Sequence, residues 1–466
     1  MISEDKCVFK NSTFSRSNYF LLIEGIPSEK TNDMQAVNKN QLFVASCLAL
    51  LVTSLSFGIR AGLLGTWESE FGLDKAEIAT IAATAFWGFP LAVIIGGIIV
   101  DVIGMKKLLM LAFFFHALGI LLTILAGKLG SPFWSLFLST LLIGIANGTV
   151  EAACNPLVAS LYTNNKTTKL NHFHLWFPGG IVIGTLIVYF LGQKDAAGSI
   201  SNWRMLVGLM LIPSVLYGYL FIKEKFPVTE RVASGISTGE MYKSLANPLF
   251  IFMIICMFGT AITELFTGQW IELLLKNVTE NALLILTITT GVMVVGRGFA
   301  GPVVHRLSPQ GVLLGSSILA ALGLYLLGHT TGNMVFIGAL VFGAGVCYFW
   351  PCMLGFVSEY LPKTGAVGMN LMGGAGMFAV SVYMMFMGGV YDKLILKQLP
   401  AGADLKAYNA ADATTQMKDA LAAANKAAGP EVINTTLVIP IILIAAFIFL
   451  VLVMRNKTKP TLVAAH

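Results

Sequence analysis

The chain has 466 residues, of which 56% are hydrophobic and only 12% are charged, and its mean hydropathy is +0.78. This is about half the charged fraction of an average soluble domain, so an ordinary soluble protein is excluded and a membrane protein is expected. The formal net charge of +6 is expected to reflect loops that flank the membrane, with no nucleic-acid partner.

Twelve apolar segments follow one another along the chain. Each has roughly the 20 residues that cross about 30 Å of hydrocarbon. We expect each segment to be a transmembrane helix, because a helix satisfies its own backbone hydrogen bonds in lipid. The predicted spans are 41–64, 76–100, 106–127, 132–161, 169–192, 202–223, 248–275, 281–304, 309–328, 332–360, 363–391 and 432–454.

Lys and Arg residues are distributed unevenly between the loops of the two sides. If the N-terminus is cytoplasmic, 18 of them fall in inner segments and 5 in short outer loops. The positive-inside rule therefore predicts that both termini are cytoplasmic. Residues 1–40, where Met34 is a second candidate for the start, and residues 455–466 are then cytoplasmic tails. The Ala-rich insertion 392–431 lies outside, and we expect a short helical hairpin there, with a simple spacer as the alternative.

A polar inner loop, 224–247, divides the spans into two bundles at 41–223 and 248–454. Internal similarity indicates a repeat, because GGIIVDVIGMKK at 96–107 has a counterpart in GRGFAGPVVHRLSP at 296–309. The expected fold is an all-α membrane protein with two pseudo-symmetric bundles of six helices. A binding site between two such halves is the architecture of an alternating-access transporter.

Three polar residues of span four, Asn147, Glu151 and Asn155, are spaced four apart and share one face of a helix. An ionised side chain at mid-bilayer is disfavoured by about 2.5 to 3.5 kcal/mol, so this face is expected to border a polar cavity. Pro156 also frees the Ala152 carbonyl for a ligand or water. We interpret this face as a hydrogen-bonding wall for a polyhydroxylated substrate. A structural carboxylate paired to a neighbouring helix is the alternative.

Further substrate-site candidates come from the second half and combine a carboxylate, amides and aromatic rings. Rings suit sugars, which present an apolar C–H face, although rings in apolar helices are also common packing residues. Trp350 holds the position in the repeat that Glu151 holds in the first half. The second-half candidates are Glu264, Gln269, Trp270, Tyr348, Trp350 and Asn370.

Two arginines inside predicted spans are candidates for coupling or gating. Arg60 in span one is expected to face the cavity, where it can pair with Glu151 and keep that carboxylate ionised. An internal gate or a structural ion pair is the alternative for Arg60. Arg297 lies near the inner end of span eight, and there we favour a gate or an anchor for the loop over a role in substrate binding.

The element GGIIVDVIGMKK resembles the loop motif between spans two and three of the major facilitator superfamily, where the motif stabilises the outward-facing state. The resemblance implies twelve spans in two bundles and a gating role for Asp101. Val102 stands where the family usually has a basic residue, and His305 replaces the aspartate in the second-half copy.

Three further motifs resemble the fucose permease and glucose/galactose permease group of this superfamily. They are Glu151-Ala-Ala-Cys-Asn155-Pro156, LNHFHLW at 170–176, and Glu264-Leu-Phe-Thr-Gly268-Gln269-Trp270. In these permeases the span-four glutamate helps to bind sugar and takes part in proton coupling, which implies both roles for Glu151. The polar position of the span-five motif matches His174, which is then expected at the cavity as a hydrogen-bond donor or proton relay.

The sequence has no Walker loop, no metal-binding helix pair and no Ser-His-Asp context, so we predict that the chain is not an enzyme. The leading hypothesis is a secondary transporter of a neutral hexose-type sugar in a bacterial inner membrane, coupled to protons. Sodium is the second candidate for the coupling ion, and no cofactor is expected. The alternatives are an organic-anion transporter with Arg60 as the carboxylate clamp, or a membrane sensor that does not transport. The expected partners are a small-molecule substrate and the lipid bilayer, and the protein is expected to be a monomer.

Overall fold

The structure, a computed structural model, describes residues 37–195, 199–268, 282–409 and 414–460. Eleven helical stretches in these residues are long and apolar enough to cross a membrane, and they match eleven of the predicted spans. The remaining predicted span, 281–304, corresponds to the shorter helix α14 (Ala282–Gly298). Within the described residues the only strand-like pairing is an isolated bridge between Lys194 and Ile200. The described part of the chain is therefore all-helical, and its long apolar helices are those of a multi-pass membrane protein.

The first bundle consists of α1 (Lys39–Ala61), α2 (Leu64–Phe71), α3 (Lys75–Ile103), α4 (Met105–Ile124), α5 (Pro132–Leu161), α6 (Lys166–His174), α7 (Trp176–Leu191), α8 (Trp203–Gly208) and α9 (Leu211–Lys223). α3 begins at a capping box in which Asp74 and Glu77 bond each other's backbone N–H groups. α5 packs closely against α3, because a Cβ atom on Gly148 would lie 2.2 Å from the Phe89 carbonyl oxygen. Small residues at such crossings are what allow membrane helices to approach closely.

The second bundle consists of α12 (Pro248–Ala261), η3 (Ile262–Phe266), α14, α15 (Ala300–His329), α16 (Met334–Val346), α17 (Phe349–Tyr360), η4 (Pro362–Thr364), α18 (Gly365–Gln398), α19 (Leu405–Asn409) and α20 (Thr415–Met454). α10 (Glu230–Ala233) and α11 (Thr238–Leu245) lie in the loop between the bundles. Within α15 the backbone leaves the helical conformation at Ser308, with φ 59° and ψ 161°, directly before Pro309. A residue before proline disfavours the helical region. The predicted end of span eight at residue 304 is thus displaced, since α14 ends at Gly298 and residues 300–307 belong to α15.

The insertion 392–431 is largely helical, but it does not form a hairpin separate from the spans. α18 runs on to Gln398, and α20 begins at Thr415 and continues unbroken into the last apolar segment. A hydrogen bond of 2.9 Å from the Tyr391 hydroxyl to Asn425 Oδ1 joins the two long helices there. The good helix formers of this segment therefore extend the membrane helices instead of starting new ones.

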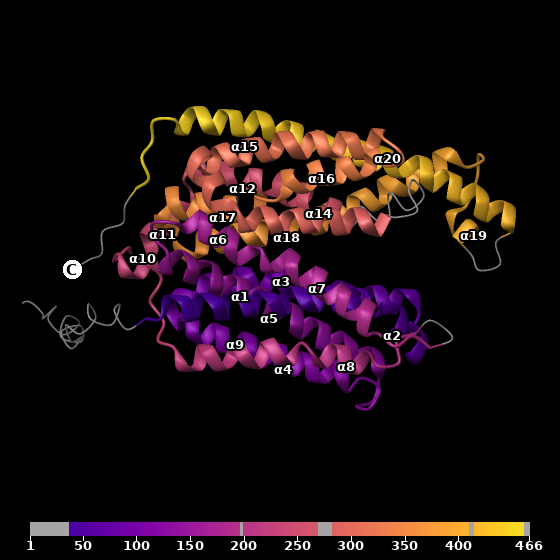
Figure 1. The fold of residues 1–466 in the computed structure, drawn as a ribbon, viewed down its shortest axis with the longest axis horizontal. Helices are drawn as coiled ribbons and strands as arrows, with labels where there is room; N and C mark the ends of the chain where they lie inside the picture. Colours follow the sequence, from indigo (N-terminus) through magenta and orange to yellow (C-terminus); the bar gives the residue numbers. More distant parts are fainter. Residues whose placement is uncertain (1–36, 196–198, 269–281, 410–413, 461–466) are drawn as a thin grey trace, which may run out of the picture. The chain divides into compact units, whose positions relative to one another are not determined.

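The two bundles face each other along helices that the internal repeat relates (Figure 1). α3 packs on α18 and α14 packs on α7, and a shift of six spans exchanges these two pairs. The same shift exchanges the contact of α6 with α17 and that of α18 with α5. This arrangement is the two-fold relation expected of a transporter built from two similar halves, with the candidate site between them.

Candidate substrate site

A small cavity of about 30 Å³ lies between the two bundles, and we call it the central chamber. Its volume is far below the roughly 300–1,000 Å³ typical of small-ligand sites, so the described conformation is contracted around it. Both bundles contribute charged and aromatic side chains to its wall. The lining residues are Phe89, Glu151, His174, Phe177, Glu264, Leu265, Arg297, Trp350 and Met377.

Glu151 of α5 is 3% exposed and borders the central chamber between two polar neighbours. Asn155, one helical turn further on, donates from Nδ2 to Glu151 Oε2 at 2.6 Å. His174 of α6 contacts both residues, because its Nε2 lies 3.0 Å from Asn155 Oδ1 and its Nδ1 lies 3.8 Å from Glu151 Oε1. An amide oxygen only accepts, so Nε2 carries a proton, and Nδ1 is the nitrogen that faces the carboxylate. We call Glu151, Asn155 and His174 the acid cluster.

The other carboxylate of the chamber, Glu264, lies in the π-helical turn η3 and is paired with Arg297 of α14. Arg297 Nη2 donates to Glu264 Oε1 at 2.8 Å, and Glu264 Oε2 accepts the backbone N–H of Trp350 at 3.3 Å. The guanidinium also donates to the carbonyls of Cys347 at 2.7 Å and His174 at 2.9 Å. Because His174 belongs to the first bundle, Arg297 both balances the charge of Glu264 and ties the bundles together.

Aromatic rings form the apolar part of the chamber wall. Trp350 of α17 is 7% exposed, and its ring lies against Gly376 of α18, where a Cβ atom would be 3.1 Å from a ring carbon. Phe89 and Phe177 line the chamber from the first bundle. The wall thus places flat apolar surfaces beside carboxylate, imidazole and guanidinium groups, a combination that suits a ligand with both hydroxyl groups and C–H faces.

Comparison with known proteins identifies the family of this chain. The family model described as Major Facilitator Superfamily matches residues 46–393. The chain belongs to this superfamily. Because its members are transporters, the assignment confirms the prediction that the chain is not an enzyme, and it agrees with the resemblance seen in the loop motif after span two.

Solved structures of other superfamily members share this fold. An outward-conformation structure of the transporter FucP has a TM-score of 0.65, 18% identity, and covers 89% of this chain and 99% of its own. The proton:xylose symporter XylE has a TM-score of 0.65 at 15% identity and covers 91% of this chain and 97% of its own. At these identities the likeness concerns the fold alone.

Curated relatives in the superfamily match over shorter stretches. A sphingosine-1-phosphate transporter of Danio rerio is 28% identical over 227 residues, which is 45% of this chain and 44% of the relative. A D-xylose transporter of Levilactobacillus brevis is 25% identical over 185 residues, or 39% of this chain and 38% of the relative. The matched region thus spans less than half of each relative, and the two relatives carry different substrates.

Asn147 does not line the chamber of this superfamily member, although it shares the polar stripe of Glu151. Its Oδ1 lies 2.8 Å from His116 Nε2, its Nδ2 donates to Ser56 Oγ at 3.2 Å, and the other His116 nitrogen contacts the Tyr217 hydroxyl at 2.8 Å. Two steps of four residues rotate a helical position by about 80°, which turns Asn147 into the first bundle while Asn155 stays at the acid cluster. The polar stripe of α5 therefore contributes Asn147 to the interior of the first bundle, and Glu151 and Asn155 to the acid cluster.

Asn370 and Tyr348, both predicted to bind substrate, bond to backbone carbonyls instead. Asn370 Nδ2 of α18 donates at 2.9 Å to the Ala152 carbonyl of α5, the acceptor that Pro156 leaves free. The bond crosses from one bundle to the other, so this carbonyl is not available to a ligand. The Tyr348 hydroxyl donates to the Gly296 carbonyl at 2.7 Å. Neither side chain lines the chamber.

Arg60 is not brought to Glu151, which corrects the expectation of a central ion pair. It lines a different cavity, inside the first bundle, and its guanidinium carbon lies 5.0 Å from the centre of the Phe57 ring. The central cation of the described chamber is Arg297, for which the sequence had favoured a gate or loop anchor. Gln269 and Trp270 lie outside the described residues.

The end of the bundles next to the inter-bundle loop is closed by charged contacts, and we call it the loop end. Lys166 of α6 pairs with Glu230 of α10 and donates to the Ser358 carbonyl of α17 at 3.0 Å. Thr167 Oγ1 donates to Glu359 Oε1 at 2.8 Å. These contacts bridge α6 and α17, one helix from each bundle.

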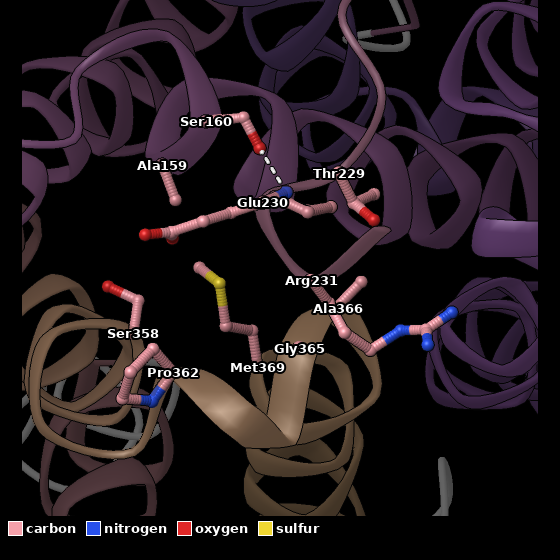
Figure 2. Close-up of a pocket in the computed structure, with 11 residues that line it drawn as sticks. Ala159, Ser160, Thr229, Glu230, Arg231, Ser358, Pro362, Gly365, Ala366 and Met369 are labelled. Carbon is pink, nitrogen blue, oxygen red and sulfur yellow. Dashed lines mark hydrogen bonds between the residues drawn. The ribbon is translucent and has the colours of Figure 1, made fainter. Parts of the chain in front are cut away.

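Asp101, the acidic residue of the loop motif, contacts the inter-bundle loop at this closed end. Its Oδ2 accepts from Arg231 Nε at 2.6 Å, and Thr229 bonds its Oδ1. Figure 2 shows the loop between α5 and α18, with the Glu230 backbone N–H bonded to Ser160 Oγ at 3.2 Å. The pocket drawn there has only about 20 Å³. The loop is thus fastened to the first bundle through Asp101 of α3 and Ser160 of α5.

Proposed function

We propose that this protein is a secondary transporter that moves a neutral hexose-type sugar by alternating access and couples this movement to protons. The observation that carries the proposal is the acid cluster. Glu151 is buried beside the chamber, and among the described residues no Lys or Arg side chain forms an ion pair with it. A carboxyl group in such a place is a candidate functional group, and proton transfer is one of the roles that such groups have in transporters.

Proton coupling follows from the charges around the chamber. Arg297 balances Glu264, which leaves Glu151 as the unbalanced carboxylate of the lining residues. One proton between Glu151 and His174 Nδ1 would neutralise the cluster and supply its missing hydrogen bond. A loaded chamber with no net charge crosses the conformational change at lower cost than a charged one. Sodium could neutralise the same carboxylate, so the coupling ion is a point for experiment.

A sugar fits the mixture of groups in the wall. Glu151, His174 and Arg297 offer acceptors and donors for hydroxyl groups, and Trp350 offers an aromatic surface for a C–H face. The fold shared with a fucose:proton and a xylose:proton symporter supports this choice of substrate class. The chamber must widen to admit a hexose, and opening one end of the bundles would do this.

The test is transport of radiolabelled hexoses and pentoses into proteoliposomes that contain the purified protein. We expect accumulation when the lumen is alkaline, and no effect of a sodium gradient. Glu151→Gln should abolish accumulation and keep exchange of labelled for unlabelled sugar, because the amide keeps the hydrogen bonds and cannot release a proton. Glu240→Gln is the matched control, because Glu240 does not line the chamber and belongs to a capping box that glutamine also completes.

Three outcomes would contradict the proposal. Sugar accumulation that depends on a sodium gradient and not on the pH gradient would show that sodium, and not the proton, is the coupling ion. Accumulation that survives in Glu151→Gln would remove Glu151 from the coupling step. Binding of sugar without any flux would indicate a sensor that has kept the transporter fold.

A second candidate function is transport of an organic anion. The position of Arg297 in the wall of the chamber favours this function. Its guanidinium lines the chamber and could transfer from Glu264 to a substrate carboxylate. Lactate and gluconate distinguish the two functions. If they compete for uptake and hexoses do not, the anion is the substrate. Arg60, which the sequence suggested as the carboxylate clamp, cannot have this role in the described conformation, because it lines a different cavity.

We also propose a topology of twelve spans with both termini in the cytoplasm of a bacterial cell, and a monomer in the inner membrane. The excess of Lys and Arg in one set of loops supports this orientation. α14 would be the core of the eighth span. Reporter domains fused after residue 460 and inserted near residue 402 test the topology. They should report opposite sides of the membrane.

A further inference from the structure

A second polar cavity lies inside the first bundle, apart from the central chamber. It has about 20 Å³, which is room for one water molecule or one small ion. Charged, indole and hydroxyl groups line it beside four apolar side chains, so it is not an ordinary packing defect. The lining residues are Ser56, Ile59, Arg60, Trp67, Thr123, Thr140, Ile143, Val207 and Met210.

One buried hydrogen-bond donor of this cavity has no acceptor among the described residues, and a guanidinium group lies in the same wall. Trp67 of α2 is 2% exposed, and its indole Nε1–H has no partner. Arg60 of α1 is 9% exposed, and its guanidinium carbon lies 5.0 Å from the centre of the Phe57 ring, with no hydrogen bond or ion pair to the other described residues. Buried donors of this kind are rare in folded proteins and indicate a bound group that satisfies them.

The missing group must be an acceptor, and the charges indicate that it is negative. A buried guanidinium without a counter-charge is strongly destabilising, and a single water would not balance it. The nearby carboxylate Glu70 is occupied, because it accepts from Trp203 Nε1 and from Arg204 Nη2 at 2.8 Å. The hydroxyl protons of Ser56 and Thr123 are already donated to helix carbonyls. The cavity therefore combines a positive charge with an unpaired N–H group and lacks a negative one.

We infer that this cavity is a binding site for one small monovalent anion of the halide type, held by Arg60 and Trp67. The anion compensates the charge of Arg60 on α1 and accepts the indole N–H of Trp67 on α2, so it links these two helices. A carboxylate-bearing metabolite is too large for the volume, which leaves chloride as the natural occupant. The site is independent of the substrate proposed for the central chamber, since none of its lining residues belongs to that chamber.

The experiment is thermal melting of the full-length purified protein in sodium chloride, sodium bromide and sodium gluconate at equal ionic strength. We expect Tm to rise with chloride or bromide in a saturable way and to stay constant with gluconate. Trp67→Phe should raise the chloride concentration at half-saturation several-fold, because it removes one donor and keeps a ring against Trp203, which lies 5.9 Å away. Arg60→Gln should abolish the halide response.

Lys223→Gln is the matched control, because it removes another cation of the first bundle, one that lies over the Tyr219 ring and does not line this cavity. It should keep the full halide response. The inference is overturned if wild-type Tm is the same in chloride and gluconate, which would indicate water in the cavity. It is also overturned if Trp67→Phe and Arg60→Gln both respond to chloride as the wild type does. Sugar transport plays no part in this readout, so failure here is distinguishable from failure of the proposed function.

Discussion

The two halves of the chamber hold their carboxylates in different ways. In the first half, Glu151 contacts an amide and an imidazole, Asn155 and His174. In the second half, Glu264 contacts a guanidinium, Arg297, and a backbone N–H. Each bundle therefore supplies one acidic group to the chamber, but only Glu264 has a permanent counter-charge.

Because of this difference, we expect the two carboxylates to have different roles. A guanidinium stays charged at all relevant pH values, so the Glu264 pair is a fixed structural element. An imidazole can gain or lose a proton, so the acid cluster can change its charge without breaking apart. We therefore expect substitutions in the second half to cost stability, and substitutions in the first half to cost coupling.

The largest effect is expected for Arg297→Met. The substitution leaves Glu264 buried without its cation and removes the bonds to the Cys347 and His174 carbonyls. Breaking one side of a buried pair costs about 3–5 kcal/mol, so Tm should fall strongly and transport should be lost. A variant that melts like the wild type would show that the pair holds neither the bundles nor the chamber.

The double variant Arg297→Met with Glu264→Gln should recover part of this loss. Removing both charges leaves no uncompensated ion, and contacting residues couple by about 0.5–3 kcal/mol in double-mutant cycles. The measurement is Tm of the two single variants and the double variant under one set of conditions. If the Tm losses of the two single variants simply add in the double variant, Glu264 and Arg297 are not energetically coupled. The second half would then have no fixed ion pair to compare with the acid cluster.

Much of the fold follows from the sequence, because a hydrophobic span is a local property. Eleven predicted spans correspond to long apolar helices of the structure. The wrong predictions concern the ends of helices, where polar residues and not a hydrophobic run mark the boundary. α14 ends at Gly298, whereas the predicted span eight runs to residue 304, and the helices of the insertion 392–431 continue the spans, because helix propensity alone does not indicate where a helix starts or ends.

The candidate site was predictable only in part, since a residue's partner lies on another helix. Periodicity placed Glu151 and Asn155 on one face, but it could not show that Asn147 turns to His116. The expected pairing of Glu151 with Arg60 was wrong, because both Arg60 and Arg297 lie in apolar spans, and only packing shows that Arg297 reaches the chamber and pairs with Glu264. The buried Glu264 in the same half was a usable signal for Arg297, since an intramembrane carboxylate needs a cation nearby.

A smaller loss of stability is expected for His174→Leu. The variant leaves Asn155 Oδ1 without its donor, which costs about 1–3 kcal/mol for a buried acceptor. The bond from Arg297 to the residue-174 carbonyl remains, because it involves the backbone. The more telling readout is transport against pH: exchange should persist, and accumulation driven by the pH gradient should weaken. An unchanged pH profile would show that Glu151 works without the imidazole.

The smallest effect on stability is expected for Glu151→Gln, and this is the sharpest test of the comparison. The amide keeps an acceptor for Asn155 and can donate toward His174 Nδ1, so it reproduces the protonated carboxyl and should change the unfolding free energy by no more than about 1 kcal/mol. Glu264→Gln, the same chemical change in the other half, leaves Arg297 without its counter-charge and should lower Tm far more. Comparing the Tm values of the two variants tests the difference between the two carboxylates, and it needs no knowledge of the substrate. Equal losses would mean that Glu151 also depends on a permanent cation, and the acid cluster would then be a structural element like its counterpart.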